Sequence, residues 1–206
     1  MARIIAFISR KGGTGKTTNA IQLATSLHAD SRKVLLIETD PNFTLATLRK
    51  MELFKQKLEE PFPLLGSSDE TVADELIAIK EGRQHQFVVV DSAGKTTNEG
   101  IKKLCLVSDV VVVPTSLTQN DLLVTYQTIT DLSPALELNP NLKILVLANR
   151  IHSSTGLHTV RENLKNLNAI ILPIVVTQKN MFAAFSTCKA EKGYEPIYRE
   201  LLKHIA

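Results

Sequence analysis

The stretch RIIAFISRKGGTGKTT, residues 3–18, decides the fold of this chain. Its first six residues form the apolar run of a buried strand, and a helical pattern follows over residues 16–27. A strand, a glycine-rich turn and a helix start, in this order, are what a phosphate-binding loop requires. Backbone N–H groups of such a loop bind phosphate oxygens, and the helix dipole favours their negative charge. The segment therefore predicts a site for a nucleotide.

The residues of this loop have distinct expected roles. Lys16 is expected to reach the β- and γ-phosphates of the nucleotide, and Thr17 to offer its hydroxyl to Mg²⁺. The standard pattern GxxxxGK[ST] is only partly met, because Arg10 stands where the first glycine belongs. A second lysine, Lys11, precedes the Gly-Gly pair. The predicted nucleotide-binding residues of the loop are Lys11, Gly12, Gly13, Thr14, Gly15, Lys16, Thr17 and Thr18.

Short apolar runs alternate with helical patterns along the rest of the chain. The runs cover residues 34–37, 87–90, 110–113, 144–147 and 170–175, and the helical patterns cover 70–79, 120–132, 155–167 and 195–205. This alternation predicts an α/β, doubly wound and mostly parallel sheet flanked by helices. Pro173 favours an edge position for the last strand. We expect residues 59–69 to form a surface loop and Asp69 to cap the next helix.

Length and composition exclude several classes of protein. The chain has 206 residues, 44% of them hydrophobic, which is too apolar for a disordered protein and sufficient for one core. No apolar run approaches the roughly 18 residues that span a bilayer. The two cysteines form no CxxC pair, which favours a reducing compartment. We expect a single domain over residues 1–206, without an N-terminal helix-turn-helix domain, in the cytoplasm.

Two carboxylates end predicted strands. The segment VLLIETDPN, residues 34–42, contains Asp40, and the segment FVVVDSAG, residues 87–94, contains Asp91. The carboxyl ends of parallel strands meet at one edge of the sheet, beside the phosphate loop. Asp91 is expected to hold Mg²⁺, through water, because that ion keeps much of its hydration shell. Gly94 is expected to offer its backbone N–H to the γ-phosphate.

The segment KGGTGKTT, residues 11–18, resembles the deviant Walker A box of the ParA/MinD ATPases, and the chain is most similar to the small ParA/ParF partition ATPases. The resemblance implies an ATP-dependent homodimer in which Lys11 reaches the phosphates bound by the partner subunit. It also implies that Asp40 orients the attacking water and contributes to the Mg²⁺ site, so the expected catalytic residues are Lys11, Lys16 and Asp40. Glu38 and Asn42 depart from the DxDPQ pattern of the family.

The resemblance extends to the adenine side and to the partners. Asn149 and Arg150 match the NR element of the family, and Gln178 falls in its second adenine-contacting loop. Family members bind DNA non-specifically through C-terminal cations and associate with the nucleoid, and a small ParB/ParG-like partner encoded nearby stimulates hydrolysis. The candidate DNA-binding residues here are Lys179, Lys189, Lys192, Arg199 and Lys203. Residues 141–206 carry 9 basic and 4 acidic side chains, which is compatible with DNA binding.

Other functions on the same fold remain open. A MinD-like membrane-associated ATPase needs a C-terminal amphipathic helix, and residues 195–205 have the required spacing. That spacing is more typical of a helix packed on the core, so we expect no membrane binding. An ATP-dependent filament former and a small-molecule ligase are further alternatives, which the sequence does not exclude.

Overall fold

The computed structural model describes residues 1–93, 98–179 and 185–205. Its strands are β1 (Arg3–Phe7), β2 (Val34–Glu38), β3 (Leu64–Gly66), β4 (Phe87–Asp91), β5 (Val110–Thr115), β6 (Lys143–Ile151) and β7 (Ile170–Thr177). Its helices are α1 (Lys16–Ala29), α2 (Thr44–Gln56), α3 (Val72–Gly82), α4 (Asn98–Val107), α5 (Gln119–Leu138), α6 (Leu157–Leu164), the 3₁₀ turn η2 (Lys192–Tyr194) and α7 (Glu195–Ile205).

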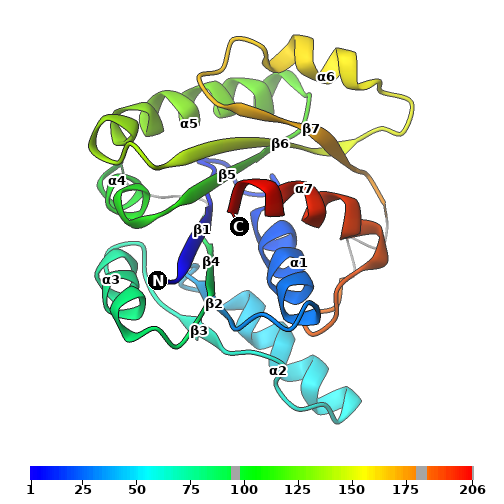
Figure 1. Ribbon diagram of the computed structural model, residues 1–206. Helices are drawn as coiled ribbons and strands as arrows, with labels where there is room; N and C mark the ends of the chain where they lie inside the picture. Colours follow the sequence, from blue (N-terminus) through cyan, green and yellow to red (C-terminus); the bar gives the residue numbers. More distant parts are fainter. Residues whose placement is uncertain (94–97, 180–184, 206) are drawn as a thin grey trace.

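The strands form one parallel sheet in the order β3-β2-β4-β1-β5-β6-β7, with helices on both faces (Figure 1). Strand β1 pairs with β4 on one side and with β5 on the other. The loop after β1 therefore lies at the centre of the carboxyl edge, where ligands bind in open parallel sheets. The predicted doubly wound α/β fold is confirmed.

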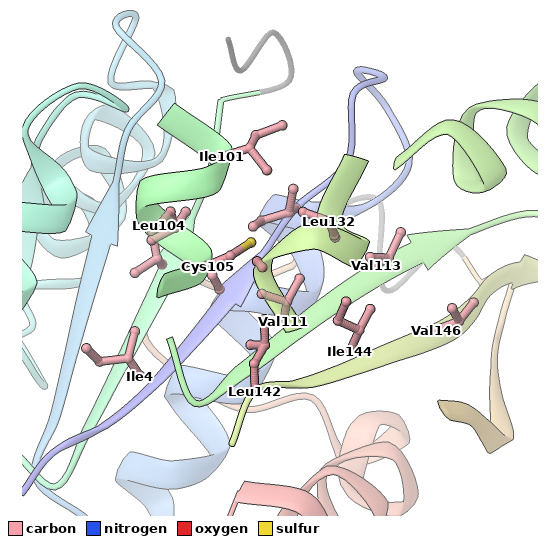
Figure 2. Close-up of a cluster of buried hydrophobic side chains, with 14 of the residues drawn as sticks. Ile4, Ile101, Leu104, Cys105, Val111, Val113, Leu132, Leu142, Ile144 and Val146 are labelled. Atoms are coloured by element: carbon pink, nitrogen blue, oxygen red, sulfur yellow. The ribbon is translucent and has the colours of Figure 1, made fainter. Parts of the chain in front are cut away.

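Each face of the sheet carries its own core. Ile4 and Ala6 of β1 face the side covered by α3, α4, α5 and α6, whereas Ile5 and Phe7 face α1 and α7. This division follows from the two-residue period of a strand. Figure 2 shows the first core, where Ile101, Leu104 and Cys105 of α4 lie over the strands. The strands are apolar on both faces because helices cover both.

Strand β7 lies at an edge of the sheet, as Pro173 indicates. Val146 pairs with Ile171 and Ala148 pairs with Val175, so the register shifts across Pro173. A proline has no N–H to donate to a ladder, and an irregular edge accommodates it.

Besides the short 3₁₀ turn η2, three of the described elements escaped the sequence analysis. Residues 59–69, expected to be a loop, contain strand β3, which is only three residues long. Helix α2 was missed because its described burial is confined to Leu45 and Arg49, which leaves little apolar periodicity to detect. Helix α4 was also missed, and its apolar face is limited to a few residues.

Helix α7 packs on the core. Ile197, Leu201 and Ile205 are buried against the α1 side of the sheet, so the face that a membrane would need is already covered. Among the described residues, no helix is both long and apolar enough to cross a bilayer.

Candidate active site

The loop between β1 and α1 forms an open backbone cradle. Gly13 and Gly15 have φ angles of +79° and +100°, a region that L side chains rarely adopt. A Cβ atom built on Gly12 or Gly13 meets no heavy atom within 4 Å, so this side of the loop is free to receive a ligand. On the opposite side, Asn149 Nδ2 donates a 2.7 Å hydrogen bond to the Thr14 carbonyl oxygen. The loop is therefore supported from β6 and open toward the sheet edge.

Lys16 lies inside this cradle with only 6% of its surface exposed. Its Nζ donates a 3.1 Å hydrogen bond to the Lys11 carbonyl oxygen. Burial lowers the pKa of Lys16, and the nearby carboxylates Asp91, Asp69 and Asp40 oppose that shift. Burial disfavours the charged form of Lys16, and an anionic phosphate placed here would favour it.

The two residues that distinguish this loop point toward α5. Arg10, which replaces the usual first glycine, forms a 3.2 Å ion pair with Asp131. Lys11 Nζ forms an ion pair with Asp121. Although burial raises the pKa of Asp121, hydrogen bonds from Lys11 and Ser116 hold it below its ordinary value. The early lysine is therefore held by its own chain, with 41% of its side chain exposed.

Asp91 ends β4 directly beside the start of α1. It is 3% exposed, and burial raises its pKa to about 7, against the effects of a hydrogen bond with the Thr17 side chain and of the charge on Lys16. Asp91 Oδ1 is buried and has no hydrogen-bond partner in the described structure. An orphaned buried carboxylate oxygen beside a threonine hydroxyl fits a hard divalent cation.

The described residues contain no group of three His, Cys, Asp or Glu side chains that could hold a metal ion. Thr17, Asp91, water and phosphate oxygens are oxygen donors of the kind that Mg²⁺ takes, and the contribution of Asp40 to the Mg²⁺ site stays a prediction.

The loop after β2 explains the two departures from the family pattern. The carboxylate of Glu38 accepts hydrogen bonds from the backbone N–H groups of Leu45 at 2.8 Å and Ala46 at 3.0 Å. It therefore satisfies the N-terminus of α2, as an N-terminal carboxylate does. Asn42 donates both its backbone N–H and its side-chain Nδ2 to Asp40 Oδ1, each at 2.9 Å. Glu38 anchors the loop and Asn42 orients the Asp40 carboxylate.

A fourth carboxylate was assigned wrongly from the sequence. Asp69 does not cap α3, whose N-cap residue is Thr71. Asp69 Oδ1 instead accepts a 2.6 Å hydrogen bond from the Thr39 hydroxyl, at the edge of the site. Little in the sequence indicates this placement, because Asp69 follows strand β3, which has only three residues.

The expected adenine-side residues separate into two places. Asn149 is buried beneath the phosphate loop. Arg150 and Gln178 line a cavity of about 410 Å³, together with Asp121 and residues of the segment 116–118. The ion-paired carboxylate of Asp121 thus lies at the wall of the cavity that holds the predicted adenine contacts. Gly94 lies outside the described residues.

The candidate DNA-binding cations fall into two groups, which differ in whether the described structure gives them an ion pair. Arg199 pairs with Glu195 at 2.6 Å and with Asp30 at 3.4 Å, and Lys203 pairs with Glu200 at 2.6 Å. Lys179, Lys189 and Lys192 are exposed, and no ion pair with them is found in the parts of the chain that the structure describes. The latter three are the better candidates for contacting an external anion.

The VirC1 protein family model matches residues 2–206. Protein virC1 of Rhizobium rhizogenes is 25% identical over 194 residues, which cover 93% of this chain and 81% of that protein. An uncharacterised protein of Pseudomonas putida is 56% identical over 41 residues, which cover 20% of this chain. The chromosome partitioning protein ParA of Caulobacter vibrioides is 49% identical over 45 residues, 22% of this chain. The matched segments span only 16% and 17% of the latter two relatives.

Solved structures share the fold across nearly the whole chain. A putative plasmid partition protein of Borrelia burgdorferi, bound to AMPPNP, superposes with a TM-score of 0.71 and 20% identity, covering 98% of both chains. The septum site-determining protein MinD of Pyrococcus horikoshii, complexed with Mg-ADP, gives a TM-score of 0.69 and 18% identity, covering 98% of this chain and 94% of that one.

Proposed function

This chain belongs to the ParA-like VirC1 protein family, and on that premise we propose that it is an ATP-hydrolysing partition or positioning protein. The observation that carries the proposal is the meeting of Lys16, Thr17 and Asp91 at one open glycine cradle. A buried lysine, a threonine hydroxyl and an orphaned carboxylate oxygen are complementary to a nucleoside triphosphate with its cation. The AMPPNP and Mg-ADP held by proteins of the same fold support this choice.

Each group has a defined task in this proposal. Lys16 leaves the Lys11 carbonyl oxygen and binds the phosphates, while backbone N–H groups of residues 12–16 bind the remaining phosphate oxygens. Thr17 and Asp91 would hold Mg²⁺, which when bound neutralises charge that develops on the phosphates. Asp40, held by Asn42, orients the water that attacks the γ-phosphate.

In this proposal Lys11 makes ATP hydrolysis depend on formation of the homodimer. In the single chain its Nζ is paired with Asp121, and this ion pair must open before Lys11 can reach phosphates in a partner subunit. Positive charge then arrives at the developing negative charge only in the ATP-bound homodimer, by the logic of an arginine finger. The proposed dimer is therefore the active species.

The proposed binding of DNA rests on three exposed lysines. Lys179, Lys189 and Lys192 would bind DNA phosphates without sequence preference, with an affinity that falls steeply with salt. The dimer would then associate with the nucleoid, and a small ParB/ParG-like partner would stimulate hydrolysis.

The test is ATP turnover and DNA binding by the purified chain. Lys16→Ala is expected to abolish turnover and to abolish ATP-dependent binding to non-specific duplex DNA. The control Lys50→Ala removes an exposed lysine of α2 and is expected to change neither. Turnover that survives Lys16→Ala contradicts the assignment of ATP hydrolysis to this loop, and DNA binding that is indifferent to nucleotide contradicts the proposed switch.

A further inference from the structure

The loop after β3 brings a carboxylate to the site that the proposed function does not use. Asp69 Oδ1 accepts the 2.6 Å hydrogen bond from the Thr39 hydroxyl. The same hydroxyl oxygen accepts a 2.9 Å hydrogen bond from the Ala93 backbone N–H. Thr39 directly precedes Asp40, and Ala93 follows Asp91 by two residues. These hydrogen bonds therefore connect the ends of β3, β2 and β4, the last two of which carry the carboxylates of the proposed reaction.

The direction of these hydrogen bonds depends on Asp69. A threonine hydroxyl has one hydrogen to donate and lone pairs with which to accept. A second acceptor for the Thr39 hydrogen, the Asp91 carbonyl oxygen, lies at 3.5 Å. A carboxylate is the stronger acceptor, because charge-assisted hydrogen bonds are shorter and stronger than neutral ones. With its hydrogen held by Asp69, the Thr39 oxygen presents a lone pair to the Ala93 N–H.

We propose that Asp69 is a positioning residue for ATP hydrolysis, holding the loops after β2 and β4 in a fixed relation through the Thr39 hydroxyl. This role rests on the proposed function, since it concerns the geometry of Asp40 and Asp91 during turnover. The backbone hydrogen bond from Thr39 N to the Asp91 carbonyl oxygen, at 3.0 Å, already links the two strands. The hydrogen bonds among Asp69, Thr39 and Ala93 connect the loops that follow these strands.

The surroundings of Asp69 fit a role in the site better than a role in α3. Asp69 is half-buried and interacts electrostatically with Lys16 and Asp40. Burial raises its pKa, and hydrogen bonding from the Thr39 hydroxyl and from the Ala93 backbone N–H opposes that shift. Helix α3 has other hydrogen bonds at its start, because the Thr71 backbone N–H donates to Ser68 Oγ at 3.3 Å. Asp69 is therefore not needed to cap α3, and its half-buried carboxylate lies close enough to Lys16 to interact with its charge.

The test measures steady-state phosphate release by variants of the full chain. Asp69→Ala and Thr39→Val are each expected to lower kcat at least about tenfold, with the KM for ATP within about twofold, because misplaced reacting groups slow chemistry more than binding. The double variant is expected to lose no more than either single variant, since both break one chain of hydrogen bonds. Thr39→Ser keeps the hydroxyl and is expected to retain the wild-type kcat.

The control is Asp74→Asn, which neutralises an exposed carboxylate of α3 and is expected to leave kcat unchanged. Thermal melting of every variant separates a kinetic loss from unfolding. Additive losses, or a wild-type kcat in Asp69→Ala, overturn the role of Asp69 while the proposed ATPase stands. Absence of turnover in the wild-type chain overturns the proposed function, and this role with it.

Discussion

Lys11 and Asp121 lie 110 positions apart in the sequence and form an ion pair in the folded chain. The pair joins the loop after β1 to the first turn of α5, beside the cavity lined by Arg150 and Gln178. The lysine that is expected to act on a partner's nucleotide is therefore held within its own subunit. In the proposed dimer Lys11 would have to leave this pair, so we expect Asp121 to weaken the assembly.

Asp121→Asn is expected to strengthen the dimer formed with AMPPNP by about two- to fivefold, because a partly exposed ion pair contributes at most about 1 kcal/mol. Sedimentation equilibrium measures the effect. Asp131→Asn is the matched control, since it removes a carboxylate of the same helix that pairs with Arg10 and leaves the Lys11 pair intact. Equal dimer affinities in the two variants contradict the prediction.

Gly15→Ala is expected to destabilise the chain and to prevent nucleotide binding. A Cβ at this position lies 2.1 Å from Asn149 Nδ2, and the φ of +100° is strained for alanine. The double variant with Asn149→Ala relieves the clash but not the strain, so it is expected to recover part of the lost stability. Thermal melting measures the stability of the single and the double variant. Gly82→Ala is the control, because a Cβ at Gly82 meets no heavy atom within 4 Å. A recovery that is complete would show that backbone strain contributes nothing.

Glu38→Ala is expected to lower the free energy of unfolding by about 1–3 kcal/mol, because the N–H groups of Leu45 and Ala46 lose their acceptor. Urea denaturation measures the change. Glu59→Ala, which removes an exposed carboxylate, is the control and is expected to have little effect. If both variants unfold at the same urea concentration, Glu38 does not anchor α2.

The raised pKa of Asp91 predicts a pH dependence for the nucleotide-free chain. Between about pH 4, the ordinary carboxyl pKa, and pH 7, the folded state retains a proton that the unfolded state has released. Stability from this group is therefore full below pH 4, falls as pH rises to about 7, and is level above. Melting temperatures in EDTA at pH 5 and pH 8 are expected to differ by several degrees more in the wild type than in Asp91→Asn. An identical pH dependence in both proteins contradicts the assignment.

Much of the site could be predicted because its parts are local in the sequence. The loop of residues 9–18 carries its glycines, lysines and threonines in one segment, and two recognisable apolar strands lead to Asp40, which follows β2 by two residues, and to Asp91, which ends β4. The strands are apolar throughout because both faces of a parallel sheet are covered, and that pattern is readable in a single chain.

The sequence by itself determined the fold class, the glycine-rich loop between β1 and α1, and the strands that Asp40 follows and Asp91 ends. Only the tertiary structure decided how residues far apart in the chain pair around that loop. Asp121 pairs with Lys11, Asn149 donates a hydrogen bond to the Thr14 carbonyl oxygen, and Asp69, which follows the three-residue strand β3, accepts a hydrogen bond from Thr39. Such contacts depend on the order of strands in the sheet and on side-chain direction, and hydrophobic periodicity reports neither.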